Sequence, residues 1–359
     1  MDAKYEFDRL VREAATAQAS DLHLEPIANG YELRRRIDGH LVVIDRAEVE
    51  AGRALVHRAM VAANLLTYRL DRPQEGRAVV ALGDGASLEV RVAIMPTLHG
   101  LRAVVRLPAH VVQRAELSAL RLPDGVLHAI EAYTQFGEGM LTLVGPAGSG
   151  KTTLLYAVLR RIHVQHPGLS VVSLEDPIER SIEGVTQVEV KPEGDMTYEA
   201  ALRSLLRQDP QVLALGEVRD RDSASLAVQA ALSGHRVVTT MHAPDVAGAI
   251  VRLLEMGIEP YQLASSLYGV LAMRLVRKRN HGRDPQQARG RQLLASFGAM
   301  DDRLRRAVLQ RAPRGEIEAN LGDQSGYAPL SRVGQAYIEN QVLDSIDIDQ
   351  ALGIRGKHR

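Results

Sequence analysis

The chain has 359 residues, with 44 basic and 44 acidic side chains and no cysteine. This length predicts two or three domains, and the lack of cysteine excludes disulfides, thiolate zinc sites, iron–sulfur clusters and a cysteine nucleophile. The zero net charge gives no reason to expect direct nucleic-acid binding. No apolar run is long enough to predict a transmembrane helix, and the acidic start of the chain does not resemble a signal peptide.

The first 108 residues predict a small α+β domain, because helical and alternating apolar patterns are interleaved there. Asp38-Gly39 is a strong hairpin signal between two of the alternating segments. The predicted elements are, in chain order, a helix over 4–18, strands over 19–26, 31–39 and 41–44, a helix over 50–66, a hairpin over 81–96 and a strand over 101–108.

The pattern changes after a predicted linker over 109–122. From residue 123 short apolar strands alternate with helices, which indicates a parallel sheet covered by helices. From about residue 258 the pattern predicts mostly helix. A basic stretch over 274–314 precedes an acidic stretch over 315–350, and these are interpreted either as solvated helical faces or as complementary contacts between subunits.

A phosphate-binding loop is predicted at GPAGSGKT (145–152), which matches G-x-x-x-x-G-K-[ST], follows an apolar strand and opens a helix. The glycines allow successive backbone N–H groups to face phosphate oxygens. We expect Lys151 to contact the β- and γ-phosphates and the Thr152 hydroxyl to coordinate Mg²⁺. No guanine-reading N-K-x-D motif follows, so ATP is favoured over GTP. The predicted nucleotide-binding residues are Gly145, Pro146, Ala147, Gly148, Ser149, Gly150, Lys151, Thr152 and Thr153.

Acidic residues follow two further apolar strands. Glu217 ends the strand over 212–217, where an acid can hold the Mg²⁺ shell or polarise the attacking water. The segment 170–179 contains Glu175 and Asp176, which are predicted to line the nucleotide site, or alternatively to cap loops. The residues alone favour Glu175 for catalysis.

Two histidines and two arginines are further candidates. His235 and His242 bracket the strand over 236–241, which suggests γ-phosphate sensing, contact between subunits or a structural role. Arg203 and Arg207 are predicted to share one helical face. That face is either solvated or senses phosphate across a subunit boundary, because guanidinium groups suit phosphate contacts.

Several longer motifs accompany the phosphate loop. They are ASDLHLEP (19–26), RRIDG (35–39), PQEGR (73–77), EVRVAIMPTLHGLRAVVRLP (89–108), SLEDPIE (173–179), LRSLLRQDPQVLALGEVRD (202–220) and ALSGHRVVTTMHAPDVAGAIVRLLEMGIEP (231–260). Together with the loop they closely resemble the ATPases of type II secretion and type IV pilus assembly, a branch of the secretion ATPase superfamily. The resemblance covers about 19–280, with a weaker tail to residue 350.

The resemblance implies an α/β architecture of four parts: a PAS-like domain (1–108), a linker (109–122), a RecA-like P-loop ATPase domain (123–275) and a helical C-terminal region (276–359). It implies a homo-hexamer that hydrolyses ATP with Mg²⁺ to assemble a type IV pilus or a type II secretion pseudopilus. It also implies a cytoplasmic location, peripheral on the inner face of the cytoplasmic membrane, with a polytopic inner-membrane platform protein as partner.

The resemblance also assigns residue roles, and it moves the general base from Glu175 to Glu179. The catalytic residues that it implies are Glu179 as general base, Glu217 as the Walker-B acid, Arg91 and Arg106 as phosphate-contacting arginines of the N-terminal domain, Arg203 and Arg207 on the helix before Walker B, and His235 and His242 of the His box.

The sequence departs from the family pattern in three places. The four-cysteine zinc module of many assembly enzymes is replaced by a basic segment within 274–294, where His281 alone cannot make a zinc site. We expect no long N-terminal extension, and MHAPD replaces the commoner LHTND while keeping His242. Retraction ATPases of pili also lack the zinc module, but 180–190 and 253–267 favour assembly. The alternatives are retraction, a nucleotide-regulated scaffold with little turnover, and a nucleic-acid motor, which the scarcity of aromatic residues disfavours.

Overall fold

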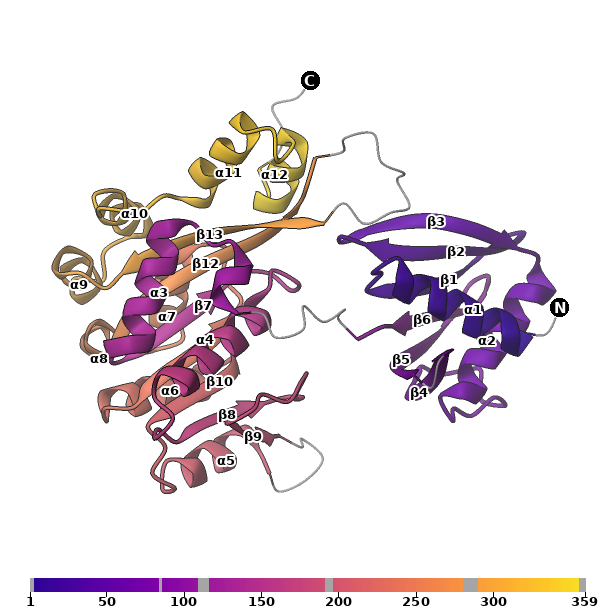
Figure 1. Cartoon of the computed structure of the whole chain (residues 1–359), viewed down its shortest axis with the longest axis horizontal. Helices are drawn as coiled ribbons and strands as arrows, with labels where there is room; N and C mark the ends of the chain where they lie inside the picture. The colour runs from indigo at the N-terminus through magenta and orange to yellow at the C-terminus, as the bar shows by residue number, and fades with distance from the viewer. Residues whose placement is uncertain (1–2, 84–85, 109–115, 191–195, 280–289, 355–359) are drawn as a thin grey trace. The chain divides into compact units, whose positions relative to one another are not determined.

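The computed structural model describes residues 3–83, 86–108, 116–190, 196–279 and 290–354. The chain divides into two compact units (Figure 1). The first unit comprises 1–113 together with 277–291, and the second comprises 114–276 together with 292–359.

The first unit is an antiparallel sheet with two helices. Its strand order is β3-β2-β1-β6-β5-β4. Its elements are α1 (Ala3–Thr16), β1 (Asp21–Ile27), β2 (Gly30–Ile37), β3 (His40–Ala47), α2 (Val49–Ala62), β4 (Gln74–Gly83), β5 (Ala86–Thr97) and β6 (Gly100–Arg106).

The two faces of this first sheet differ because apolar and polar residues alternate along its strands. Leu22 and Leu24 of β1, together with Val105 of β6, are buried in one core with residues of α1 and α2. The intervening residues Asp21 and His23 lie on the other face. The alternation in the sequence therefore places the apolar side chains on the face that packs against the helices and the charged side chains on the opposite face.

Several boundaries of the first unit differ from the prediction, among them those of β1, β4 and α2. Strand β1 continues through Pro26, which pairs with Tyr31. Strand β4 begins at Gln74, well before the predicted start at residue 81. The sequence did not indicate this start, because Gly76 interrupts the apolar alternation that signals a strand. Helix α2 ends at Ala62 rather than residue 66, and Asn64 adopts a left-handed conformation with φ of 56° just after it.

The second unit is a larger sheet with helices on both faces. Its strand order is β13-β12-β7-β11-β10-β8-β9, and the pairs from β12 to β9 are parallel. Its elements are the 3-10 helix η1 (Leu117–Leu120), α3 (Asp124–Phe136), β7 (Met140–Val144), α4 (Lys151–Gln165), β8 (Val171–Glu175), β9 (Thr186–Glu189), α5 (Tyr198–Leu205), β10 (Val212–Val218), α6 (Arg221–Leu232), β11 (Arg236–Met241), α7 (Val246–Glu255), α8 (Pro260–Ser266), β12 (Leu267–Arg277), β13 (Arg291–Ala299), α9 (Asp302–Leu309), α10 (Arg314–Gly322), α11 (Leu330–Glu339) and α12 (Ser345–Leu352).

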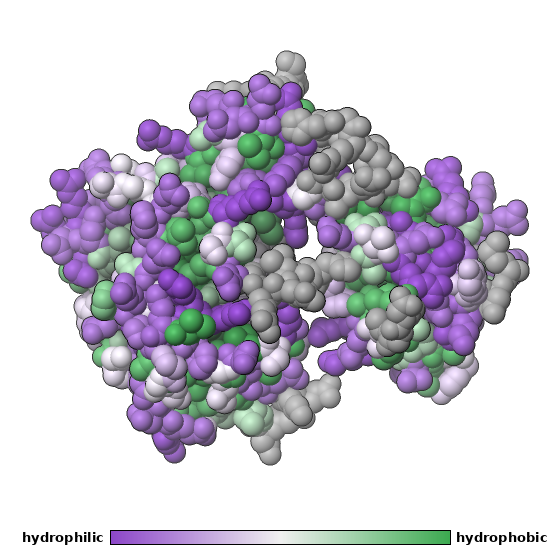
Figure 2. All heavy atoms as spheres, in the orientation of Figure 1, coloured by the Kyte–Doolittle hydropathy of each residue, from purple (hydrophilic) through white to green (hydrophobic). Residues whose placement is uncertain are grey.

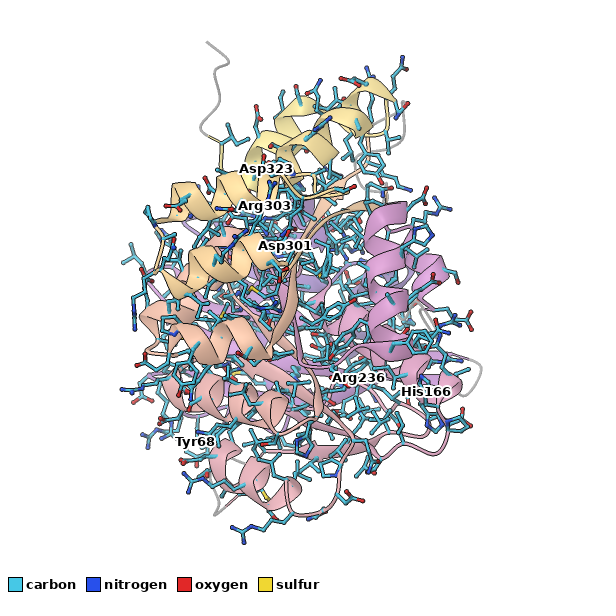
Figure 3. The ribbon with its side chains drawn as sticks, turned by 90° about the vertical axis from the view of Figure 1, so that its left-hand side faces the viewer. Tyr68, His166, Arg236, Asp301, Arg303 and Asp323 are labelled. Atoms are coloured by element: carbon cyan, nitrogen blue, oxygen red, sulfur yellow. The ribbon has the colours of Figure 1, made fainter. Side chains whose placement is uncertain are left out.

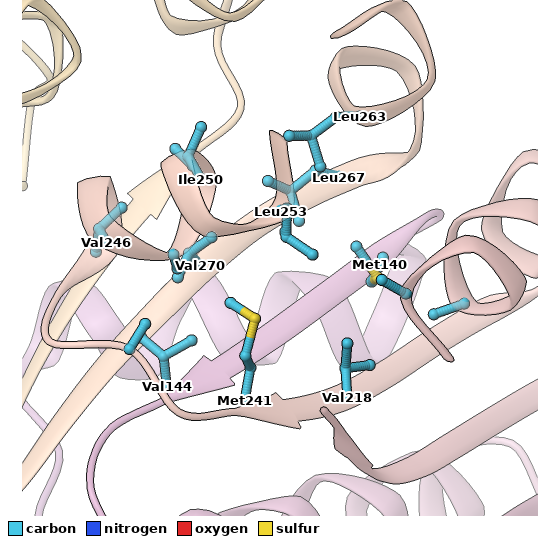
Figure 4. Packing of buried hydrophobic residues seen from close by; sticks show 14 of the residues in the cluster. Met140, Val144, Val218, Met241, Val246, Ile250, Leu253, Leu263, Leu267 and Val270 are labelled. Carbon is cyan, nitrogen blue, oxygen red and sulfur yellow. The ribbon is translucent and has the colours of Figure 1, made fainter. Parts of the chain in front are cut away.

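Both faces of this second sheet are packed at its central strands, which are therefore largely apolar. Met140 and Val144 of β7 belong to the core that includes α6 and α7, and Leu141 and Leu143 belong to the core formed with α3 and α4. Figure 4 shows the first of these cores, in which apolar side chains of α7 face those of β7 and β11. Continuous apolar strands of this kind are typical of parallel sheets covered on both sides, as the sequence predicts.

The prediction that the chain is mostly helical after residue 258 is wrong for β12 and β13. The run LYGVLAMRLVR of β12 is apolar almost throughout, and such a run does not distinguish a buried strand from a buried helix. The burial that decides it comes from pairing with β7. The predicted linker also contains the 3-10 turn η1, whose Leu117 is buried.

The basic and acidic stretches near the C-terminus meet within the chain. Arg303 of α9 and Asp323 after α10 form an ion pair with a distance of 3.1 Å (Figure 3). Helices α11 and α12 bury few residues, and their surface in Figure 2 is mostly hydrophilic. The basic segment that replaces the zinc module, with His281, lies mainly in 280–289, outside the described residues.

Candidate functional site

The predicted acids and the phosphate loop meet at one edge of the second sheet. Strands β7, β8, β10 and β11 are neighbours in a parallel arrangement, so their carboxyl ends share an edge. The phosphate loop leaves β7 there, and Glu175, Glu217 and His242 stand at the ends of the other three strands. In open α/β sheets this edge is where ligands bind.

The phosphate loop requires glycine at three positions. Gly145, Gly148 and Gly150 have φ values of 158°, 73° and 94°. A Cβ on Gly145 would lie 2.6 Å from the Met273 carbonyl oxygen, which leaves no room for a side chain. Gly150 is the N-cap of α4 and supplies no side chain to it, so the start of the helix faces the loop with its backbone.

Lys151 lies over this loop. Its Nζ donates to the carbonyl oxygens of Gly145 and Pro146, at 2.8 and 3.0 Å. Burial and the nearby Arg274 lower the pKa of Lys151, while Glu217 opposes that shift. The Ser149 hydroxyl is buried in the loop and has no partner among the described residues. The loop thus holds a cation and an unused polar group beside the start of a helix.

Thr152 and Glu179 also meet. The Thr152 hydroxyl lies 3.4 Å from Glu179 Oε1. Glu179 belongs to the segment between β8 and β9, so the contact joins the first turn of α4 to that segment. The acid that the family resemblance selects is therefore the one adjacent to the phosphate loop.

Glu217 is the centre of a charged cluster. Its Oε2 accepts from Arg219 Nε at 2.7 Å, and its Oε1 lies 2.9 Å from His242 Nε2. Arg219 also lies 3.6 Å from Asp176. We refer to Asp176, Glu217, Arg219 and His242 as the Glu217 cluster, which connects three strand ends in one chain of polar contacts.

Glu175 is enclosed by protein donors. It is 3% exposed. One carboxylate oxygen accepts from Ser173 Oγ at 2.6 Å and from Gln187 Nε2 at 3.0 Å, and the other accepts from the Tyr156 hydroxyl. It lies at the carboxyl end of β8, as the motif predicts, but its oxygens are occupied by these buried donors.

Three predicted residues lie apart from these contacts. His235 precedes β11 and hydrogen-bonds the Ala230 carbonyl, at the strand end opposite His242. Arg203 pairs with Glu199 on α5. The prediction that Arg203 and Arg207 share a helical face is wrong, because α5 ends at Leu205 and Arg207 lies in the following turn. After Leu205 the chain continues as a tight turn, in which the Arg207 N–H donates to the Ser204 carbonyl. Asp209, with a φ of 51° before a proline, prevents the helix from continuing.

Arg91 and Arg106 belong to the first unit, where they lie directly opposite each other on β5 and β6. Arg77 on β4 is opposite Arg91, and Asp21 on β1 is opposite Arg106. Directly opposite residues point to the same face of an antiparallel sheet. We refer to Arg77, Arg91 and Arg106 as the arginine row. Arg106 pairs with Asp21 at 3.0 Å, whereas Arg91 has no hydrogen-bond or ion-pair partner in the described part of the chain.

The sequence model for type II/IV secretion system proteins matches residues 4–341. The chain belongs to this family. The type II secretion system protein HxcR of Pseudomonas aeruginosa is 41% identical over 271 residues, which are 75% of this chain and 57% of that protein. The type II secretion system protein E of Xanthomonas campestris pv. campestris is 34% identical over 360 residues, 90% of this chain and 63% of that protein. The chain thus spans less than two thirds of the length of these two relatives.

Two solved structures share the fold of this chain. The Legionella pneumophila ATPase DotB superposes with a TM-score of 0.75 at 19% identity, covering 97% of this chain and 95% of DotB. The pilus retraction motor PilT with bound ADP superposes with a TM-score of 0.67 at 22% identity, covering 96% of both chains. At such identities the likeness establishes the fold alone. No helix in the described part of this secretion-family chain has the length and hydrophobicity needed to cross a bilayer.

Sequence reasoning missed two residues near the carboxyl edge of the second sheet, Tyr156 and Arg219, and one residue of the arginine row in the first unit, Arg77. Tyr156 reads as a core residue of α4, and its polar contacts are invisible in the pattern. Arg219 is only two residues after Glu217 in the LGEVRD segment, and this spacing could have indicated that the two side chains meet. Arg77 stands in the PQEGR motif, but its place in the arginine row depends on strand register.

Proposed function

We propose that the chain hydrolyses ATP and uses the energy to assemble a type IV pilus or a type II secretion pseudopilus. The observation that carries this proposal is the contact between Thr152 of the phosphate loop and Glu179, beside the Glu217 cluster. Hydrolysis of a phosphoanhydride needs positive charge on the phosphates and an oriented water. The residues for both requirements are held at one sheet edge.

In this proposal each residue has a distinct task. Lys151 and the backbone of the glycine-rich loop bind the β- and γ-phosphates. Glu179 accepts the proton of the attacking water as general base. Glu217, whose carboxylate contacts Arg219 and His242, would act as the Walker-B acid that holds the Mg²⁺ shell. Asp176 supports this arrangement through Arg219.

The residues at this edge fit a nucleotide and Mg²⁺. The buried Ser149 hydroxyl without a partner and the uncapped start of α4 suit an anion. Thr152 and Glu217 supply the hydroxyl and carboxylate oxygens that Mg²⁺ prefers. When bound, the ion would neutralise phosphate charge.

The arginines complete the proposal. Arg91 and Arg106 would contact phosphates from the PAS-like unit, and this contact would couple hydrolysis to the approach of the two units. Arg203, Arg207 and His235 would act at the boundary between subunits of a homo-hexamer. The second unit would be RecA-like, and the motor would work in the cytoplasm against a polytopic platform protein of the inner membrane.

Relatives named as type II secretion proteins support export or assembly as the direction of work. PilT, a retraction motor by its name, shares the fold, so retraction is the alternative direction. A nucleotide-regulated scaffold with little turnover is the alternative to a motor.

ATP hydrolysis by the full chain with Mg²⁺ tests the proposal. We expect Lys151→Ala and Glu179→Gln each to lower kcat by about 100-fold or more, because charge stabilisation and general-base catalysis each contribute factors of this order. Glu183→Gln is the matched control, since Glu183 is an exposed acid of the same segment. Binding of ATP without turnover, even with the membrane platform protein present, would favour the scaffold and overturn the motor.

A further inference from the structure

Glu175 is the central acceptor of a buried hydrogen-bond network. Its carboxylate receives hydrogen bonds from Ser173, Gln187 and Tyr156. A buried carboxylate that is satisfied by protein donors has little capacity left for a nucleotide or a metal ion. The question is therefore what the surrounding side chains do with their remaining hydrogen-bonding atoms.

Tyr156 uses its hydroxyl twice. It donates to Glu175 and accepts from the backbone N–H of Glu179 at 3.2 Å. The Arg180 guanidinium lies 5.6 Å from the centroid of the Tyr156 ring, a distance at which a cation is attracted to the ring face. Tyr156 thus contacts two successive residues of the segment that carries the proposed general base.

Gln187 joins the same carboxylate to the next part of that segment. Besides donating to Glu175, its amide nitrogen donates to the Arg180 carbonyl at 2.8 Å. Its amide oxygen accepts from the N–H of Ile182 at 2.7 Å. Residues 179–182 are therefore tied through two side chains to one buried anion.

The helical spacing of Tyr156 adds a second link to the phosphate loop. Thr152 and Tyr156 are separated by four residues on α4, so they lie on one face of that helix. Thr152 contacts the carboxylate of Glu179, and Tyr156 contacts its backbone nitrogen. The helix that begins with Lys151 thus holds Glu179 at both its side chain and its main chain.

We propose that Tyr156, anchored by Glu175, is a positioning residue that holds Glu179 in register with the phosphate loop. This inference rests on the proposed role of Glu179 in ATP hydrolysis. Phenylalanine would fill the same volume but leave Glu175 without one donor and Glu179 N–H without its acceptor. Misplacement of a catalytic group by about 1 Å can cost about 100-fold in rate.

Tyr156→Phe tests the inference, with Tyr133→Phe as matched control. Tyr133 is also buried in the second unit, but its hydroxyl donates to the carbonyls of Gly139 and Val237, outside the Glu179 segment. We expect Tyr156→Phe to lower kcat about 10- to 100-fold while ATP affinity stays within about threefold. Tyr133→Phe should leave kcat within about twofold. A kcat within twofold of wild type for Tyr156→Phe would overturn the inference.

Combining the variant with Glu179→Gln shows whether Tyr156 acts through Glu179. If it does, adding Tyr156→Phe to Glu179→Gln lowers kcat no further, because residues that act as a unit are not additive. A further loss of about tenfold in the double variant would contradict the positioning role.

Hydrogen exchange provides a readout that does not depend on turnover. In Tyr156→Phe, peptides covering 176–182 should exchange about tenfold faster, and peptides covering 145–150 should not change. Unchanged exchange over 176–182 would overturn the inference whether or not ATP is hydrolysed. If exchange accelerates but the wild type does not hydrolyse ATP, the positioning contact stands and the motor function fails.

Discussion

The carboxyl edge of the second sheet and the charged face of the first sheet differ in how completely their charged side chains are paired. At the carboxyl edge, Glu217 is paired with Arg219 and His242, and Glu175 is enclosed by donors. In the arginine row, three cations stand side by side on neighbouring strands. Arg106 pairs with Asp21 and Arg77 pairs with Glu89, whereas Arg91 has no ion-pair partner among the described residues.

The difference indicates that the charge of Glu175 supports the fold, whereas the charge of Arg91 is free to act on a ligand. A satisfied charge keeps its neighbours in place, whereas like charges on directly opposite residues destabilise a sheet. Residues that lower the stability of the fold, and that make no stabilising contact in exchange, are typical of functional sites. By this reasoning Arg91 is available to an anion, and Glu175 is not available to one.

The largest expected effect is on turnover. Arg91→Ala should lower kcat for ATP hydrolysis by about 100- to 1,000-fold, because a positive group directed at developing phosphate charge contributes about 3 to 4 kcal/mol. The measurement is steady-state hydrolysis with circular dichroism to confirm folding. Arg46→Ala is the control, since Arg46 is an exposed arginine of β3 that pairs with Glu32. Near-wild-type turnover of Arg91→Ala would show that Arg91 does not act on the nucleotide.

A smaller effect is expected on stability near the phosphate loop. Arg274 is 8% exposed and donates to the carbonyls of Ala351, Met273 and Pro244. Arg274→Met keeps the apolar stem but leaves these carbonyls without their donors, so we expect a loss of about 2 to 3 kcal/mol in the free energy of unfolding. Urea denaturation measures it.

The exposed pair of Arg303 with Asp323 provides the comparison for this prediction. Arg303→Met should cost less than about 1 kcal/mol, as is usual for surface ion pairs. Equal losses for the two variants would show that burial does not distinguish these arginines.

The smallest expected effect has the opposite sign. Arg91→Ala should raise the free energy of unfolding by at most about 0.5 kcal/mol at low salt, because it removes repulsion from the flanking arginines, whose partners Glu89 and Asp21 offset part of that repulsion. The gain should shrink at about 1 M salt, where screening acts over a few ångströms. Thermal unfolding at two salt concentrations measures it. A loss of stability at low salt would mean that the arginine row supports the sheet.

Sequence patterns accounted for much of the fold and for the main features of the site. The phosphate loop, the acids after β8 and β10, and the hairpin at Asp38 depend on local chemistry, so their elements were predictable. Strands β12 and β13 were not, because an apolar run has no period that separates strand from helix when both faces are buried. The end of α5 before Arg207 was also not predicted, because the apolar pattern does not reveal the left-handed conformation of Asp209.

The sequence by itself determined that this secretion-family chain contains a phosphate loop and acidic strand ends, because glycine spacing and strand-terminal acids act over a few neighbouring residues. Tertiary structure decided which acid faces which partner. Glu175 and Glu179 belong to one motif, yet Tyr156 and Gln187 enclose the first and Thr152 meets the second. The arginine row likewise exists only through strand register, which places residues far apart in the chain directly opposite one another.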